Sequence, residues 1–410
     1  MDINTAKQLV IDAGLNLIKC GLIARTWGNV SCRIDENSFV ITPSGIAYEN
    51  LTPEKIVLVN IADCSYTGDV KPSSEKKVHA SVYAMRPDAN FVIHTHQTYA
   101  SAVGAVGCDI NYLTDEGAEI IGPGVTVAAY GLPGTKKLNK GVRDALGRCP
   151  SKAIIMSHHG ALCFGEDYDE AFRVAAQLEF ESENFIKRRF VTLTGAIADQ
   201  FSDLVDYFAT HAGGAEKTSP AFEHFDSTRE GTTAVLVSKE DGRVIRVNLK
   251  SREVRTETTR AGADYTFSVD LHKAVYNRRK DVQCILHSED EDIVTMSKAK
   301  KLIKPYLDDF AQLVGISMRT VDFNTGNVVA SAKQVAAALG KRGAVMLKDN
   351  GALCVAADLY DAEAVEMVVK KNVKAVAATK SFTHTKPINV FESALMHTVY
   401  KLKYSKNRDK

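Results

Sequence analysis

Several features that mark specialised protein classes are missing from this sequence. Lys and Arg total 51 against 50 Asp and Glu, so the net charge of +1 favours neither a nucleic acid nor an acidic membrane surface as a partner. No apolar run of about 18 residues occurs, and no charged segment followed by an apolar one opens the chain. We therefore expect no membrane-spanning helix and no secretion.

Disulfide frameworks are also not indicated. The eight cysteines are scattered along the chain without a Cys-x-x-Cys pair, a pattern that favours reduced thiols and a cytoplasmic protein. Hydrophobic residues at 45% and charged residues at 25% are typical of a soluble globular protein. Because 410 residues exceed one ordinary core, we expect two domains.

What the sequence does contain is a histidine pattern that fits a metal site. The apolar segment Phe91–His96 is predicted to be a buried strand, and it ends in the motif His94-Thr95-His96. Alternate side chains of a strand point to the same face, so His94 and His96 point the same way. A catalytic zinc usually takes three protein ligands, so at least one more donor is expected.

Two further segments offer such donors. A second apolar strand begins at Ala153 and stops at the pair His158-His159, which Gly160 follows. Ser73-Ser74-Glu75 places a carboxylate at the start of a predicted helix. Any one of these histidines alone is more often a hydrogen-bonded core residue, and we treat His79 in that helix as structural. The combination favours a metal.

Five motifs in chain order resemble the class II aldolase/adducin family. They are Gly28-Asn29-Val30-Ser31, Ile41-Thr42-Pro43-Ser44-Gly45, Ser73-Ser74-Glu75, His94-Thr95-His96 and His158-His159-Gly160-Ala161. The resemblance covers roughly residues 1 to 190. It implies an α/β fold, in α-β-α layers around a largely antiparallel sheet. It also implies that His94, His96 and His159 bind Zn²⁺ and that Glu75 is the catalytic glutamate.

The same resemblance implies a sugar-phosphate substrate. Small residues in three loops let backbone N–H groups approach an anion, and a helix start favours phosphate, although each loop alone is more often an ordinary turn. The predicted phosphate-binding residues are Gly28, Asn29, Ser44, Gly45, Ser73 and Ser74. The family's aldolases are tetramers, so a homo-oligomer is implied as well.

The second half of the chain repeats the first at an offset of about 190 residues. The repeated segments are Val78–Tyr83 with Leu271–Tyr276, Phe91–His94 with Cys284–His287, and Gly160–Cys163 with Gly351–Cys354. So long a period indicates a duplicated domain rather than a solenoid unit. We expect a zinc-binding catalytic domain over residues 1–205, a linker over 206–230 and a degenerate copy over 231–410.

The second copy has lost most of the predicted ligands. The positions of Glu75, His94, His96 and His159 are occupied there by Ser268, His287, Glu289 and Asn350. One His, one Glu and one Asn make a poor zinc set, because asparagine is a weak neutral ligand for this metal. We therefore predict one zinc per chain, in the first copy, and a packing role for the second.

Three functions are compatible with these features. The leading one is a zinc-dependent lyase, in which the metal polarises a carbonyl and stabilises the enediolate formed when a C–C bond breaks. The second is dehydration, as in the methylthioribulose-phosphate dehydratases of the same family. The third is a non-catalytic interaction protein of the adducin type, which suits the second copy better than the first.

The catalytic acid is where this sequence departs from the fuculose-phosphate aldolases of the family. These enzymes carry a tyrosine whose position falls here at or near Asp115, and no tyrosine stands in register. Glu116 matches a glutamate of the dehydratases once a short gap is allowed. Asp115 and Glu116 are therefore candidate catalytic acids, and an exposed acidic turn is the plain alternative. Tyr112 or Tyr130 would substitute only if the loop is remodelled.

Overall fold

The computed structural model describes residues 1–23, 27–211, 218–251, 253–256, 265–299, 302–382 and 385–404. The chain divides into two compact units, one made of residues 1–197, 378–387 and 399–410, the other of residues 198–377 and 388–398. Within the described residues, no helix combines the length and the apolar composition needed to cross a membrane.

A seven-stranded sheet forms the centre of the first unit. Its strands are β1 (Asn29–Arg33), β2 (Ser38–Ile41), β3 (Val57–Asn60), β4 (Phe91–Thr95), β5 (Thr126–Ala128), β6 (Ala153–Met156) and β7 (Ala161–Gly165). They lie in the order β3-β2-β1-β4-β7-β6-β5, and every neighbouring pair is antiparallel except β5 with β6. The sheet is therefore largely antiparallel, and β4 lies at its centre.

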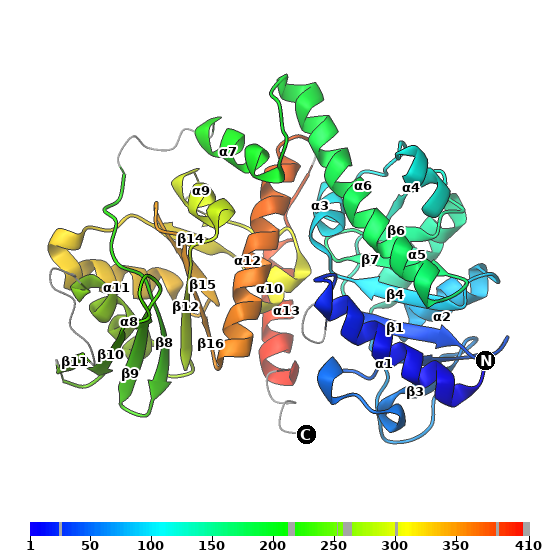
Figure 1. Ribbon diagram of the computed structural model, residues 1–410, viewed down its shortest axis with the longest axis horizontal. Coiled ribbons are helices and arrows are strands. Elements are labelled where there is room, and N and C mark those ends of the chain that lie inside the picture. Colours follow the sequence, from blue (N-terminus) through cyan, green and yellow to red (C-terminus); the bar gives the residue numbers. More distant parts are fainter. Residues whose placement is uncertain are drawn as a thin grey trace. The chain divides into compact units, whose positions relative to one another are not determined.

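Helices pack on both faces of this sheet (Figure 1). They are α1 (Ile3–Lys19), α2 (Lys76–Met85), α3 (Thr98–Val106), α4 (Asp115–Ile120), α5 (Lys136–Arg148) and α6 (Tyr168–Thr194). On the face of α2 and α5, Val82 and Val142 join Val92 of β4 in one apolar cluster. Helices α1, α3 and α6 also contact the strands, whereas α4 packs on α6. This layering is the α-β-α arrangement that the resemblance implies.

The second unit contains a nine-stranded sheet with the same central order. Its strands are β8 (Phe225–Glu230), β9 (Thr233–Ser238), β10 (Val244–Asn248), β11 (Val254–Thr256), β12 (Cys284–Ser288), β13 (Leu302–Ile303), β14 (Met318–Val321), β15 (Ala344–Leu347) and β16 (Ala352–Ala356). The order β10-β9-β8-β12-β16-β15-β14 reproduces that of the first sheet, and the parallel pair β14–β15 matches β5–β6. Strands β11 and β13 are additions at its two edges.

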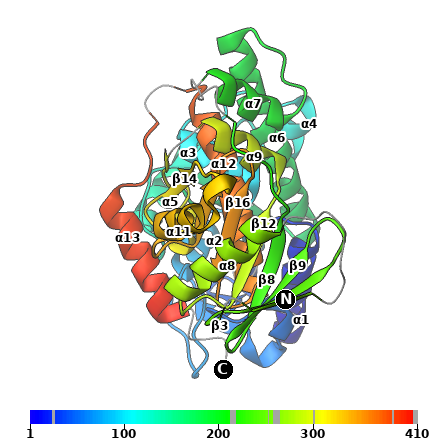
Figure 2. The ribbon, with the colours of Figure 1, turned by 90° about the vertical axis from the view of Figure 1, so that its left-hand side faces the viewer.

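The helices of the second unit follow the same plan. They are α7 (Phe201–His211), α8 (Thr266–Arg278), α9 (Glu291–Ala299), α10 (Asp308–Leu313), α11 (Val328–Leu339), α12 (Leu359–Thr379) and α13 (Val390–Val399). Helices α8 and α11 pack against each other (Figure 2), and their buried residues join the sheet in one core cluster. They correspond to α2 and α5 of the first unit.

The unit boundaries differ from the predicted ones. Helix α7 contacts α9 through a buried apolar side that includes Phe201 and Leu204, so the second unit begins at residue 198 rather than near 206. The predicted linker over 206–230 contains the end of α7 and the whole of β8. Residues 212–217 of that linker lie outside the described residues. The predicted linker is therefore too long, because a polar, glycine-rich composition does not reveal where the neighbouring helix and strand end or begin.

Candidate metal centre

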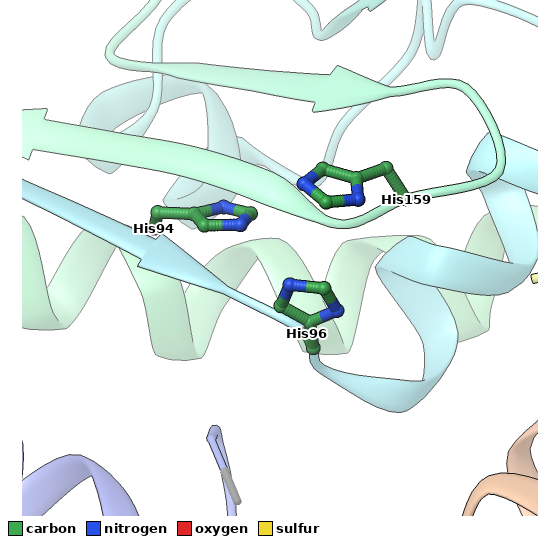
Figure 3. A group of neighbouring side chains, drawn as sticks. All are labelled: His94, His96 and His159. Atoms are coloured by element: carbon green, nitrogen blue, oxygen red, sulfur yellow. The ribbon is translucent and has the colours of Figure 1, made fainter. Parts of the chain in front are cut away.

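Three histidines of the first unit meet at the end of the central strand. His94 lies on β4, between Asn29 of β1 and Leu162 of β7 in the sheet register, and His96 follows one residue after the strand. His159 comes from the turn between β6 and β7. Figure 3 shows the three rings pointing toward one another, and one donor atom from each lies within 4.8 Å of the others.

The turn that delivers His159 is shaped by its neighbours. His158 adopts a left-handed backbone conformation with φ of 61°, and Gly160 follows His159. A Cβ atom at Gly160 would lie 2.1 Å from the carbonyl oxygen of Thr95, so only glycine lets the turn approach β4 this closely. The local sequence His-His-Gly therefore places one imidazole against the two of the strand.

These residues fit a metal ion such as zinc. The Nδ1–H group of His94 donates a hydrogen bond of 2.9 Å to the carbonyl oxygen of Ala161, which leaves the Nε2 lone pair for the cluster. A ligand histidine typically donates its other ring N–H in this way, because the bond fixes the tautomer and the ring orientation. All three side chains are buried, and three imidazoles are a usual donor set for a catalytic zinc.

Glu75 lies directly beside this cluster. It is the N-cap residue of α2, and its Oε1 and Oε2 atoms lie 2.8 Å from His159 Nε2 and 3.1 Å from His94 Nε2. Burial raises the pKa of the Glu75 carboxyl, but the adjacent His159 and His94 side chains outweigh that effect and hold its pKa well below the usual value. An ionised, buried carboxylate at the ligand set is able to accept and return a proton.

The structure brings several of the predicted phosphate-binding residues to the same place. The loops around Ser44 and Ser73 run side by side, because Ser44 N–H donates to the carbonyl of Lys71 and Ser73 N–H to that of Thr42. The Ser73 hydroxyl accepts a 3.2 Å bond from the N–H of Glu75, which ties this loop to the carboxylate. Ser74 is exposed one residue before Glu75.

Glycines permit the remaining contacts of these loops. Gly28 has φ of +79°, and a Cβ atom there would lie 2.5 Å from the carbonyl oxygen of His94, so the loop before β1 passes directly beside this histidine. Asn29 follows it and donates a 3.2 Å hydrogen bond from Nδ2 to Glu75 Oε2. Gly45 also has positive φ, at +76°, with open space around it.

The predicted catalytic acids lie at the start of α4. Asp115 and Glu116 are exposed in the first turn of α4. Tyr112 is 83% exposed, whereas Tyr130 is partly buried with its ring 5.3 Å from that of His158. The geometry therefore tests neither candidate acid, and their role stays a prediction.

Sequence reasoning missed the connection of His79 to this centre. His79 Nε2 lies 2.5 Å from Asn29 Oδ1, and Asn29 in turn bonds to Glu75. The one signal in the sequence was the spacing of His79 four residues after Glu75, which places both on the same side of α2. Nothing else in the sequence ties His79 to the predicted metal, and for that reason a structural role was expected.

The second unit has a different arrangement at the equivalent positions. The His224 ring stacks on the ring of His287 at 3.8 Å, and its nitrogens lie 2.7 Å from Glu289 Oε1 and 3.3 Å from Asn350 Oδ1. An imidazole thus contacts all three counterparts of the ligands. Within the part of the chain that the structure describes, the three histidines of the first unit form the one group suited to a metal.

Known proteins match both halves of the chain. The model of the class II aldolase and adducin N-terminal domain matches residues 8–185 and again residues 227–375. The chain is 30% identical over 189 residues to a 5-deoxy-D-ribulose 1-phosphate aldolase of Bacillus thuringiensis serovar kurstaki, which covers 45% of this chain and 86% of the relative. It is 32% identical over 192 residues to the L-fuculose phosphate aldolase of Escherichia coli K12, covering 47% and 87% of the two chains.

A solved L-fuculose 1-phosphate aldolase structure matches at 27% identity with a TM-score of 0.43, covering 48% of this chain and 91% of that one. The relatives are thus matched over most of their own length, each by about half of this chain. The family model matches twice, once in each unit. The chain belongs to the class II aldolase and adducin family.

Proposed function

We propose that the first unit cleaves a C–C bond of a phosphorylated sugar with a zinc ion bound by His94, His96 and His159. The observation that carries this proposal is the meeting of three buried imidazoles with one buried carboxylate, Glu75, which lies across two of them. A purely structural histidine cluster has no need of an ionised carboxylate at its donor atoms.

The relatives support the lyase class. They are aldolases of sugar phosphates by name, and a third, of Rhodospirillum rubrum, is a 5-methylthioribulose-1-phosphate/5-deoxyribulose-1-phosphate aldolase with 30% identity over 213 residues. The chain is accordingly an enzyme of the lyase class, and a sugar phosphate is the substrate class that we propose for it. A cytoplasmic location and a homo-oligomeric state stay predictions.

The metal and Glu75 would have different roles in the reaction. A bound zinc ion supplies Lewis acidity, which polarises a carbonyl and favours negative charge on its oxygen. Aldol cleavage also needs two proton transfers. One proton leaves the substrate hydroxyl that becomes the aldehyde oxygen, and another is added to the carbon of the other fragment at which the C–C bond broke. Glu75 is ionised and placed at the donor atoms, so it is suited to transfer one of these protons.

The loops around the centre are suited to orient the substrate. Ser73 accepts a hydrogen bond from the Glu75 N–H, the Ser44 loop runs beside the Ser73 loop, and Gly28 lies against the His94 carbonyl. A phosphate held by these loops would fix the distance from the carbonyl to the carboxylate. Orientation of this kind supplies a large share of the rate in bimolecular and proton-transfer steps.

Dehydration is the second candidate, favoured by Glu116. Its carboxylate stands at the start of α4 in a segment without a tyrosine in register, and a carboxyl acid suits the loss of water from a sugar phosphate. An interaction role of the adducin type is a third candidate, for the second unit only, because its ligand counterparts are Glu289 and Asn350.

Two measurements on the purified protein would test the proposal. Metal analysis should find zinc, and a screen of ketose 1-phosphates should detect release of an aldehyde from at least one of them. Dehydration would instead remove water from the substrate and release no aldehyde, so mass analysis of the products separates the two reactions.

A matched pair of variants would locate the chemistry. Glu75→Gln should keep the zinc and lower kcat by roughly 100-fold to 10,000-fold, the usual contribution of a general acid or base. Glu289→Gln makes the same chemical change at a half-exposed carboxylate of the second unit and should leave kcat near that of the wild type. Near-normal turnover of Glu75→Gln would contradict the proposed role of this carboxylate.

A further inference from the structure

A continuous row of buried hydrogen bonds runs from the interior of α2 to Glu75. Tyr83 Oη lies 2.7 Å from Ser31 Oγ, which lies 2.6 Å from His79 Nδ1. On the other side of the ring, His79 Nε2 lies 2.5 Å from Asn29 Oδ1, and Asn29 Nδ2 lies 3.2 Å from Glu75 Oε2. All five side chains are buried, so water does not replace any of these partners.

The direction of these bonds follows from the orientation of the Asn29 amide. Its Nδ2 group donates to Glu75 Oε2, and its oxygen, which can only accept, faces His79 Nε2. His79 must then donate from Nε2, which makes Nδ1 an acceptor for the Ser31 hydroxyl. Ser31 in turn accepts from Tyr83. Every donor therefore points toward Glu75, and neighbouring bonds of such a row polarise one another.

The second unit keeps half of this row and lacks the other half. Ser227 Oγ lies 2.7 Å from His272 Nδ1 and 2.9 Å from Tyr276 Oη, as in the first unit. The residue two positions before Ser227 is Phe225, where the first unit has Asn29, and His272 Nε2 has no hydrogen-bond partner among the described residues.

This internal comparison separates two roles. The Ser-His-Tyr group alone suffices to join helix and sheet, because it persists in a unit that has Ser268 in place of Glu75. The first unit has both the asparagine and the glutamate, and the second unit has neither. The bond from His79 to Asn29 is thus specific to the unit that holds the metal centre.

We infer that His79 is a positioning residue for the reaction, which fixes the Asn29 amide so that its NH₂ group holds the Glu75 carboxylate in place. This inference rests on the proposed function of Glu75. Without the donor at Nε2, the Asn29 amide is free to rotate, and the carboxylate loses the side-chain donor that Asn29 supplies from the sheet. Burial, together with the nearby His94, lowers the pKa of His79 to about 3, so the ring is neutral at physiological pH.

The hydrogen-bond direction is testable without any measurement of activity. Nitrogen NMR of the ¹⁵N-histidine-labelled protein distinguishes the two neutral tautomers of His79, with its signal identified by its loss in His79→Gln. We expect the Nε2–H tautomer at pH 7 and a shift of that signal in Asn29→Ala, with the His272 signal unchanged. An Nδ1–H tautomer or an imidazolium ion would overturn the inference, whatever reaction the enzyme catalyses.

Kinetics would test the consequence for the reaction. His79→Gln keeps an amide donor near the Nε2 position, whereas His79→Asn keeps a polar group only near Nδ1. We expect kcat of His79→Asn to be at least tenfold below that of His79→Gln, within the 10-fold to 100-fold range typical of groups that orient a metal-site residue, with KM and zinc content similar in both. Equal kcat values for the two variants would refute the positioning role.

A double-variant cycle completes the test. If His79 acts through Asn29, His79→Asn should lower kcat in the wild type and have almost no further effect in Asn29→Ala. Additive losses would show that His79 acts independently of Asn29 and would refute the inference. Absence of aldol cleavage in the wild type would refute the proposed function instead, and the NMR result would still decide the hydrogen-bond direction.

Discussion

Replacing Gly160 by Ala would test how the turn between β6 and β7 delivers its ligand. A Cβ atom at this position would lie 2.1 Å from the Thr95 carbonyl oxygen, whereas real Cβ contacts are essentially never shorter than 3.0 Å. β4 is paired on both sides, with β1 and β7, so the turn rather than the strand has to move, by about 1 Å. His159 is the preceding residue and moves with it.

That displacement is large on the scale of a metal site. Ligand distances in zinc sites hold to within about 0.2 Å, so a movement of about 1 Å exceeds the tolerance several times over. We expect zinc binding to weaken by at least about tenfold, as it does when an orienting contact of a ligand is lost. The overpacking itself should lower the free energy of unfolding by about 1 to 3 kcal/mol.

The duplicated fold supplies a matched control. A Cβ atom at Gly351 would lie 1.9 Å from the Ser288 carbonyl oxygen, in the corresponding turn of the second unit. Gly351 also has φ of +76°, which alanine rarely adopts, so Gly351→Ala should lower stability by at least as much and leave zinc binding unchanged. A Cβ atom at Gly147 in α5 would have no neighbour within 4 Å, so Gly147→Ala should be neutral or slightly stabilising.

Competition with a chromogenic chelator would measure the zinc affinity, and calorimetry would measure the stability of the same samples. Zinc bound by Gly160→Ala as tightly as by the wild type would refute the argument from the turn. Loss of zinc from Gly351→Ala would refute it as well, because the second unit would then contribute to binding.

Three further predictions concern the metal, the acid and pH. Metal analysis should find about one zinc per chain. His94→Ala should abolish zinc binding, whereas His287→Ala should not. Two tightly bound zinc ions per chain would contradict the loss of ligands from the second unit. Glu116→Gln should lower turnover at least roughly 100-fold with the zinc retained if this carboxyl is the acid, and a near-normal rate would exclude it. Burial lowers the pKa of His272 from 6.5 to about 3, so the folded state binds fewer protons than the unfolded state between these pH values. The free energy of unfolding should therefore fall as pH drops from 6.5 toward 3. Chemical denaturation should show a less steep fall for His272→Gln.

The elements with clear periodicity were predictable from the sequence. The strand predicted over Phe91–His96 forms over Phe91–Thr95, and the one predicted from Ala153 ends at Met156, before the histidine pair. Their apolar residues are buried because both faces of the sheet are covered. The histidine cluster follows from them, because strand alternation places His94 and His96 together and Gly160 allows the close turn. The duplication is confirmed by the family model, which matches in both units.

The contacts between distant elements were not predictable. His79 bonds to Asn29 of β1, and nothing in the local sequence of α2 shows which strand residue its ring will meet. The same limit applies to the end of the first unit, since the packing of α7 on α9 depends on the fold of a region about 90 residues later. The local hydrophobic pattern therefore predicts helices and strands, whereas the polar partner of a side chain depends on how distant elements pack against each other.

His224 leads to the last prediction, which concerns why the second unit is stable without a metal. Its imidazole stacks on His287 and bonds to Glu289 and Asn350, so it meets the polar groups that stand at the former ligand positions. The Glu289 carboxylate is half exposed, so its pair with His224 contributes little stability, whereas Asn350 and His287 are buried and costly to leave without partners.

His224→Ala should therefore lower the free energy of unfolding by about 1 to 3 kcal/mol while the zinc content stays near one per chain. His211→Ala is the control, because this exposed histidine bonds to the carbonyl oxygen and stacks on the ring of Tyr207 in its own helix, and it should lower stability much less and leave the zinc content unchanged. If His224→Ala unfolds like the wild type, the imidazole is not what stabilises this site, and the second unit must hold its buried polar groups by other contacts.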